Sequence, residues 1–183
     1  NDAAWLLDDT MDRVGADRPA LRAPDGTTWS YGELQQRANQ VAQVLTDDLG
    51  LVPGNRVMLR APNNPWVVAC WFGALKAGAV VVTTMAALRA VEITPIVAAS
   101  KPTIALVDHR FAEDVHAVRD SSAPDLTIVE FGGSGADDLV ARCDAKSGEF
   151  TAVATAADDV ALLGPTSGTT GVPKLTMHFH RDV

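Results

Sequence analysis

Short apolar runs alternate with segments of helical pattern along most of this chain of 183 residues. The runs read as strands at 56–60, 79–83, 103–107 and 126–131. The second run, Ala-Val-Val-Val-Thr, shows no polar alternation, which is typical of a parallel strand that is covered on both sides. Strands that alternate with helices at this spacing form a mostly parallel sheet. The sequence therefore predicts an α/β fold with helices on both faces of the sheet.

Two helix starts are marked by local chemistry. The sequence 30–33, Ser-Tyr-Gly-Glu, has the form of a capping box, and Pro65 occupies the favoured first turn of the next helix. That second helix, at 66–77, is apolar nearly all round, which predicts burial on most of its sides. We therefore expect Trp66 and Trp71 to be core residues rather than ligand-stacking residues.

The other elements follow from periodicity and turn residues. We expect a short amphipathic helix at 3–14 and a β-hairpin that turns at 24–26, Pro-Asp-Gly. Further helices are predicted at 89–100, 111–119 and 137–142. The stretch 145–157 has little pattern and is expected to be a surface loop. His109 and His116 are expected to be solvated helix residues.

A stretch rich in glycine and hydroxyl side chains follows the last apolar run, 160–163. It reads Thr166-Ser-Gly-Thr-Thr-Gly-Val-Pro-Lys174. Its glycines allow a ligand to approach the backbone closely, its hydroxyls add donors and Lys174 adds a positive charge. This combination is suited to phosphate. A polar hairpin turn would explain the glycines and Pro173, but not the convergence of four hydroxyls and a lysine.

This stretch differs from a Walker-type loop, because no Gly-Lys-[Ser/Thr] ends it and no helical pattern follows at once. Residues 175–180 alternate in apolar character and predict a strand, so the loop should join strand to strand. We expect the loop at the carboxyl end of the strand at 160–163, because ligands bind at the carboxyl ends of strands in such folds. His178 and His180, two apart on the second strand, could share a metal ion. Without a third ligand nearby, structural or substrate-adjacent roles are expected instead.

The stretch 166–174 resembles the signature of the adenylate-forming (AMP-binding) superfamily, which includes acyl- and aryl-CoA synthetases, peptide-synthetase adenylation domains and luciferases. Its continuation at 177–182, Met-His-Phe-His-Arg-Asp, is most similar to aryl-CoA ligases of the benzoate and 2-aminobenzoate type. Segments 30–34, 61–65 and 74–84 also resemble the family. Leu175 departs from the pattern, since many members carry glycine there. The resemblance implies that 1–183 form the N-terminal portion of the large domain of an adenylate-forming enzyme, with the C-terminal remainder absent.

The resemblance implies a function as well. Family members use ATP to convert a carboxylic acid, here an aromatic one, to an acyl adenylate and then to a thioester of the co-substrate coenzyme A. The residues that would bind the ATP phosphates are Thr166, Ser167, Gly168, Thr169, Thr170, Gly171 and Lys174. Lys174 would also be the catalytic residue, as a point charge beside the leaving pyrophosphate. The Mg²⁺ ligands would lie outside residues 1–183, and the 183-residue chain alone is expected to be inactive.

Two other interpretations stay open: a piece of a peptide-synthetase adenylation domain, and a truncated nucleotide-binding module without catalysis. The net charge of −8 argues against nucleic acid or an anionic membrane as partner. No apolar run is long enough to span a bilayer. Cys70 and Cys143 lack metal-binding spacing and indicate a reducing compartment. We therefore expect a cytoplasmic enzyme with no metal site of its own in residues 1–183.

Overall fold

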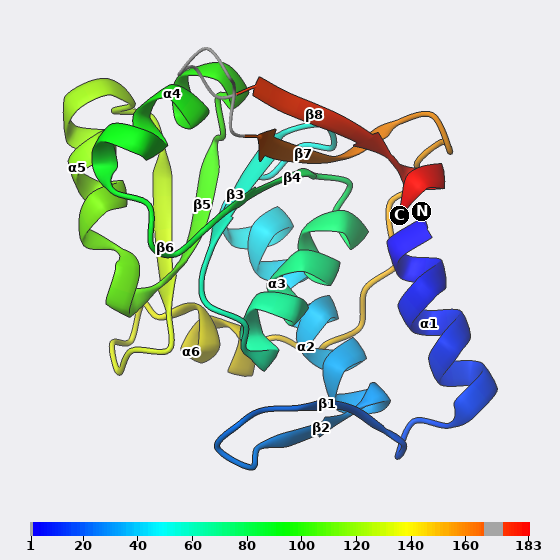
Figure 1. The fold of residues 1–183 in the computed structure, drawn as a ribbon. Helices are drawn as coiled ribbons and strands as arrows, with labels where there is room; N and C mark the ends of the chain where they lie inside the picture. The colour runs from blue at the N-terminus through cyan, green and yellow to red at the C-terminus, as the bar shows by residue number, and fades with distance from the viewer. Residues whose placement is uncertain (1, 167–173) are drawn as a thin grey trace.

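The computed structural model describes residues 2–166 and 174–183, and its centre is a six-stranded sheet in the order β6-β5-β3-β4-β7-β8 (Figure 1). All neighbouring strands in it pair in parallel except β7 and β8, which form an antiparallel pair at one edge. The strands are β3 (Arg56–Arg60), β4 (Val80–Thr84), β5 (Ile104–Asp108), β6 (Thr127–Phe131), β7 (Val160–Thr166) and β8 (Lys174–Phe179). The predicted α/β class with a mostly parallel sheet is confirmed.

Helices cover both faces of this sheet. Side chains alternate along a strand, so Val57 and Leu59 of β3 point to one face and Met58 points to the other. Val57 and Leu59 pack in a buried cluster with α2, α3 and α6, whereas Met58 packs in a second cluster with α4 and α5. These helices are α2 (Tyr31–Gln43), α3 (Pro65–Lys76), α4 (Ala90–Ser100), α5 (Glu113–Ser122) and α6 (Leu139–Asp144).

The division of the helices between the two faces follows from the direction of each crossover. α3 leads from β3 to β4, whereas α5 leads from β5 to β6, in the opposite direction along the sheet. Crossovers between parallel strands are almost always right-handed, so crossovers in opposite directions lie on opposite faces. The two buried clusters agree with this rule. β3 and β5 are therefore neighbouring strands whose following helices lie on opposite sides of the sheet.

The predicted helix starts are confirmed. Ser30 Oγ accepts from the Glu33 N–H at 3.2 Å, and Glu33 Oε2 accepts from the Ser30 N–H at 2.7 Å. Asn64 Oδ1 accepts from the Val67 N–H at 2.9 Å at the start of α3. After α2 the chain continues as a π-helical turn, Val44–Asp48, which the sequence pattern did not indicate.

The N-terminal segment lies beside the helices that cover one face of the sheet. α1 (Asp2–Val14) packs against α3, and the predicted hairpin forms a separate two-stranded sheet of β1 (Pro19–Arg22) and β2 (Thr28–Ser30) (Figure 1). Lys76, in the last turn of α3, is 1% exposed. Its ammonium group donates to Asp8 Oδ1 at 2.7 Å and to Asn39 Oδ1 at 2.8 Å. This buried contact joins α1, α2 and α3.

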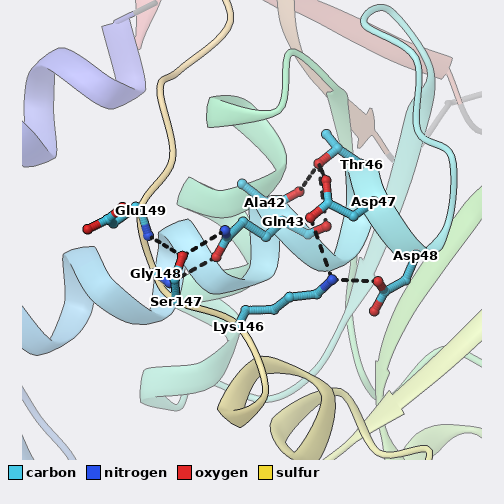
Figure 2. Close-up of polar contacts among 9 residues, drawn as sticks. All are labelled: Ala42, Gln43, Thr46, Asp47, Asp48, Lys146, Ser147, Gly148 and Glu149. Carbon is cyan, nitrogen blue, oxygen red and sulfur yellow. Dashed lines mark hydrogen bonds and ion pairs between the residues drawn. The ribbon is translucent and has the colours of Figure 1, made fainter.

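The segment 145–157 is the predicted surface loop, since it contains no helix or strand and none of its residues is buried, and side chains from earlier in the chain bind it. Gln43 Oε1 accepts from the Gly148 N–H at 2.9 Å, and Lys146 Nζ contacts Asp48 at 2.6 Å (Figure 2). Asn39 Nδ2 donates to the Gly148 carbonyl at 2.9 Å. Side chains of α2 and of the turn after it thus bind a backbone segment that lies about a hundred residues later in the chain.

One prediction about a histidine is wrong. β8 ends at Phe179, so His180 is not on the strand and lies buried in the 3₁₀ turn His180–Asp182. The Asp182 carboxylate accepts from the Phe179 N–H at 3.0 Å, which fixes this turn. His116 lies on α5 as predicted, with 36% of its side chain exposed, and its Nε2 lies 2.8 Å from Glu130 Oε1 on β6.

Candidate functional site

The predicted phosphate-binding stretch connects β7 to β8. Thr166, the last residue of β7, is the cross-strand partner of Lys174, the first residue of β8. Thr166 Oγ1 donates to the Lys174 carbonyl at 3.3 Å, and both residues are exposed. The other predicted site residues, Ser167, Gly168, Thr169, Thr170 and Gly171, lie outside the described residues. The predicted strand-to-strand connection is confirmed, and its two ends lie side by side at the carboxyl end of β7.

The register of β7 and β8 determines which side chains share a face with Lys174. Leu162 pairs with His178, and alternation places Thr166, Lys174 and His178 on the same face as Leu162. Leu162 packs against the cluster that contains α3, so this is the α3 face. A Cβ at Gly164 would lie 3.7 Å from His178 Nε2, so the imidazole lies beside this glycine. His178 therefore belongs to the face that carries Lys174, whereas His180 does not continue the strand.

An apolar groove of about 430 Å³ lies on the α3 face, near the carboxyl ends of β3 and β4. Leu59 and Thr83 line it from the sheet, and Trp71 and Phe72 line it from α3. These two aromatic rings meet edge to face with their centroids 5.0 Å apart. Trp71 is therefore partly buried at the border of a groove, although α3 was predicted to be buried on most sides.

Arg60, the last residue of β3, is a buried cation that the sequence analysis did not single out. Its guanidinium donates to the carbonyl oxygens of Met85, Leu88 and Phe111. Asp114 lies 3.7 Å away. Desolvation lowers the pKa of Arg60, and the nearby Asp114 carboxylate acts in the opposite direction. Because its partners follow β4 and β5, Arg60 fixes two loops at the carboxyl edge of the sheet.

Asp108, the last residue of β5, is buried in a similar network. It accepts from Arg110 Nε at 2.9 Å and from Arg110 Nη2 at 2.8 Å. Asn64 Nδ2 also donates to Asp108, at Oδ2, over 3.3 Å. The hydrogen bonds from Arg110 lower the pKa of Asp108 despite burial. A second cavity, of about 590 Å³, lies beside these residues.

Residues 2–166 and 174–183 contain two cysteines and no candidate metal centre. No group of three or more His, Cys, Asp or Glu side chains there could hold a metal ion. Cys70 and Cys143 are free and buried. Burial raises the pKa of both thiols, that of Cys143 to about 12. No helix in the described ranges is long and apolar enough to cross a membrane.

Residues 7–183 match the family described as AMP-binding enzyme. The chain belongs to this family. Long-chain-fatty-acid–CoA ligase FadD13 of Mycobacterium tuberculosis (strain ATCC 25618 / H37Rv) is 34% identical over 154 residues, which are 84% of this chain and 30% of that protein. Benzoate–CoA ligase of Thauera aromatica is 30% identical over 160 residues, or 87% of this chain and 30% of that protein.

Solved structures of AMP-binding enzymes have the same fold. The crystal structure of the anthranilate CoA ligase AuaEII in complex with anthranoyl-AMP matches with a TM-score of 0.90 and 26% sequence identity. The match covers 99% of this chain and 35% of that one. The chain thus spans about a third of the length of these relatives. The resemblance that was read from 166–174 extends over nearly the whole chain.

Proposed function

We propose that this chain is the N-terminal portion of the large domain of an adenylate-forming acid–thiol ligase and contributes its phosphate-binding loop. In the complete enzyme, a carboxylate attacks the α-phosphorus of ATP and expels pyrophosphate. The acyl adenylate is then attacked by the thiol of coenzyme A. The observation that carries the proposal is the pairing of Thr166 with Lys174, which closes a donor-rich loop at the carboxyl end of β7.

The predicted site residues of the loop each have a role in this proposal. The glycines 168 and 171 let backbone N–H groups approach the phosphates, and the hydroxyls of Thr166, Ser167, Thr169 and Thr170 add donors. Lys174 neutralises the charge that develops on pyrophosphate as the bond to the α-phosphorus breaks. Mg²⁺ prefers carboxylate and water oxygens, and 166–174 contain no carboxylate. From the family resemblance, we place the Mg²⁺ ligands outside 1–183.

For the acid, we propose an aromatic carboxylate of the benzoate or 2-aminobenzoate kind. The similarity to the Thauera benzoate ligase and to the anthranilate ligase structure supports this class. The aromatic side chains of Trp71 and Phe72 beside the strand ends agree with a flat, apolar substrate. A long-chain fatty acid is the competing class, which the 34% identity to FadD13 supports. Thioester formation with benzoate, 2-aminobenzoate, octanoate and palmitate would decide, and a preference for the fatty acids would overturn the aromatic class.

The test of the function uses the longer protein that contains these residues. Lys174→Met should slow acid-dependent ATP–pyrophosphate exchange about 100-fold, the usual cost of one lost charge-stabilising donor. Thioester formation from a preformed acyl adenylate should change little, because pyrophosphate has already left. Lys101→Met is the matched control, since Lys101 is an exposed lysine at the other end of the sheet, before β5. Equal slowing of both half-reactions would contradict the assigned role of Lys174.

The same assays separate the alternatives. The 183-residue chain alone should show no exchange with any acid, because we place the Mg²⁺ ligands and other catalytic groups outside it. Acid-dependent exchange by this chain would contradict that part of the proposal. Transfer to a carrier-protein thiol in place of coenzyme A would favour the peptide-synthetase alternative, and ATP binding by the longer protein without exchange would favour a non-catalytic module.

A further inference from the structure

The cavity of about 590 Å³ lies at the carboxyl edge of the sheet, beside β3 and β5. Its walls come from the β1–β2 hairpin, from 63–66 at the start of α3, from 108–110 at the end of β5 and from the end of β6. β3 and β5 are neighbours, but α3 and α5 leave them on opposite faces. Such a switch point in an open α/β sheet is where ligands commonly bind. The predicted phosphate-binding loop between β7 and β8 is elsewhere, because it follows β7, which lies two strands from β3 in the sheet.

Hydrogen-bond donors face this cavity. Asn63 is exposed, and its side-chain amide makes no hydrogen bond to the part of the chain that the structure describes. Arg110 uses Nε and Nη2 for Asp108, which leaves Nη1 for a ligand. α3 begins at Pro65 on the same wall, and the N-terminus of a twelve-residue helix adds partial positive charge. The wall therefore favours an anionic group.

Aromatic rings form another part of the wall. Trp29 and Trp66 both line the cavity, with their rings edge to face and their centroids 5.4 Å apart. The Arg37 guanidinium lies 5.3 Å from the Trp66 ring centroid. Indole rings pack well against flat aromatic ligands, in stacked or edge-to-face geometry. The rings therefore favour a planar ligand over a saturated one of equal charge.

Two carboxylates also border the cavity. Asp108 is 3% exposed, and its oxygens already accept from Arg110 and Asn64. Asp25 is exposed on the β1–β2 turn and accepts from the Thr27 N–H at 2.9 Å, a bond that lowers its pKa. Asp25 is thus an ionised group that opposes an anion, whereas the charge of Asp108 is compensated within the protein.

We propose that this cavity binds a planar aromatic ring that carries an anionic group, independently of the loop between β7 and β8. The ring contacts Trp29 and Trp66, and the anion accepts from Asn63 and from Arg110 Nη1. An aryl carboxylate and a nucleoside monophosphate share this chemistry. The assignment rests on the walls of the cavity and does not use the proposed ligase activity.

Titration of the 183-residue chain with benzoate or with adenosine 5′-monophosphate, followed by NMR, tests the proposal. The indole N–H signals of Trp29 and Trp66 should shift, and those of Trp5 and Trp71 should not. Cyclohexanecarboxylate, which has the charge without the flat ring, should bind about five- to tenfold more weakly than benzoate. Shifts with only one of the two aromatic anions would identify the source. Shifts with neither, or equal binding of cyclohexanecarboxylate and benzoate, would overturn the proposal.

Variants of single wall residues sharpen the test. Arg110→Gln should weaken binding about tenfold, because a charge-assisted hydrogen bond is lost. Asn63→Ala removes an exposed amide without disturbing the fold and should weaken binding about threefold. Asp25→Asn keeps the turn acceptor, removes the opposing charge and should tighten binding about twofold at low salt.

Two controls complete the set. Arg119→Gln is matched to Arg110→Gln, because Arg119 is a partly exposed arginine paired with the adjacent Asp120 on α5. It should leave binding unchanged, and equal effects of the two arginine variants would overturn the site. Lys174→Met should also leave the shifts of Trp29 and Trp66 unchanged. Loss of these shifts in Lys174→Met would assign the ligand to the loop between β7 and β8, and that result would refute the proposal while leaving the proposed ligase function standing.

Discussion

At the β3–β5 end of the carboxyl edge the charged side chains of Arg60 and Asp108 are buried and bonded to the protein, whereas at the β7–β8 hairpin Thr166 and Lys174 are exposed. Arg60 and Asp108 are 1% and 3% exposed, and each has several hydrogen-bond partners. Thr166 and Lys174 are exposed and share one side-chain hydrogen bond. A buried charge needs partners within the fold, while a charge that binds a ligand has to stay available. The difference indicates that Arg60 and Asp108 are structural residues of the fold, whereas Thr166 and Lys174 remain available to a ligand.

The largest expected effect is the loss of Arg60. Arg60→Met removes the donors to three carbonyl groups and leaves Asp114 without its cationic partner, so the free energy of unfolding should fall by about 3–5 kcal/mol. Urea unfolding followed by circular dichroism measures it. Lys174→Met is the control at the hairpin end and should change the unfolding free energy by less than about 0.5 kcal/mol. Similar losses in both variants would remove the distinction between structural residues and residues available to a ligand.

A smaller effect is expected from two glycine substitutions, one in the buried contact between α2 and α3 and one in the β7–β8 hairpin. A Cβ at Gly73 of α3 would lie 2.7 Å from the Ala38 carbonyl oxygen and from Val41, so α2 and α3 would have to separate. Gly73→Ala should lower the unfolding free energy by about 1–3 kcal/mol. At Gly164 on β7 the nearest atom, His178 Nε2, lies 3.7 Å away, which is ordinary contact. Thermal unfolding should therefore show almost no change for Gly164→Ala, and a larger loss there than at Gly73 would refute the comparison.

Much of the fold could be predicted because its signals are local. The apolar runs that form β3 to β6 and the Ser30–Glu33 capping box are each visible within a few residues of sequence. What could not be predicted depends on distant partners. The firm attachment of 145–157 requires side chains of α2 that lie about a hundred residues earlier. His180 was wrongly placed on the strand, because β8 ends at Phe179 and the chain then turns, which the apolar alternation of 175–180 does not reveal.

The candidate site could likewise be predicted only where its signals are local. The stretch 166–174 could be recognised from its composition and resemblance, and its strand-to-strand geometry followed from the pattern after Lys174. Arg60 and Asp108 were not recognised as structural residues, because each bonds to loops that follow other strands. The sequence signal for both residues was their position as charged residues at the end of an apolar strand. The cavity beside β3 and β5 depends on strand order, which the sequence alone did not provide.

The most direct test of the central claim, that the hairpin end holds phosphates, is the affinity of this chain for pyrophosphate, measured by calorimetry. Lys174→Met should weaken the binding at least about tenfold, since a charge-assisted contact to phosphate is removed, with no change in melting temperature. Lys101→Met, at the amino end of β5, should bind pyrophosphate like the unaltered chain. Undiminished binding by Lys174→Met, or an equal loss in both variants, would contradict the assignment of the β7–β8 hairpin as the phosphate site.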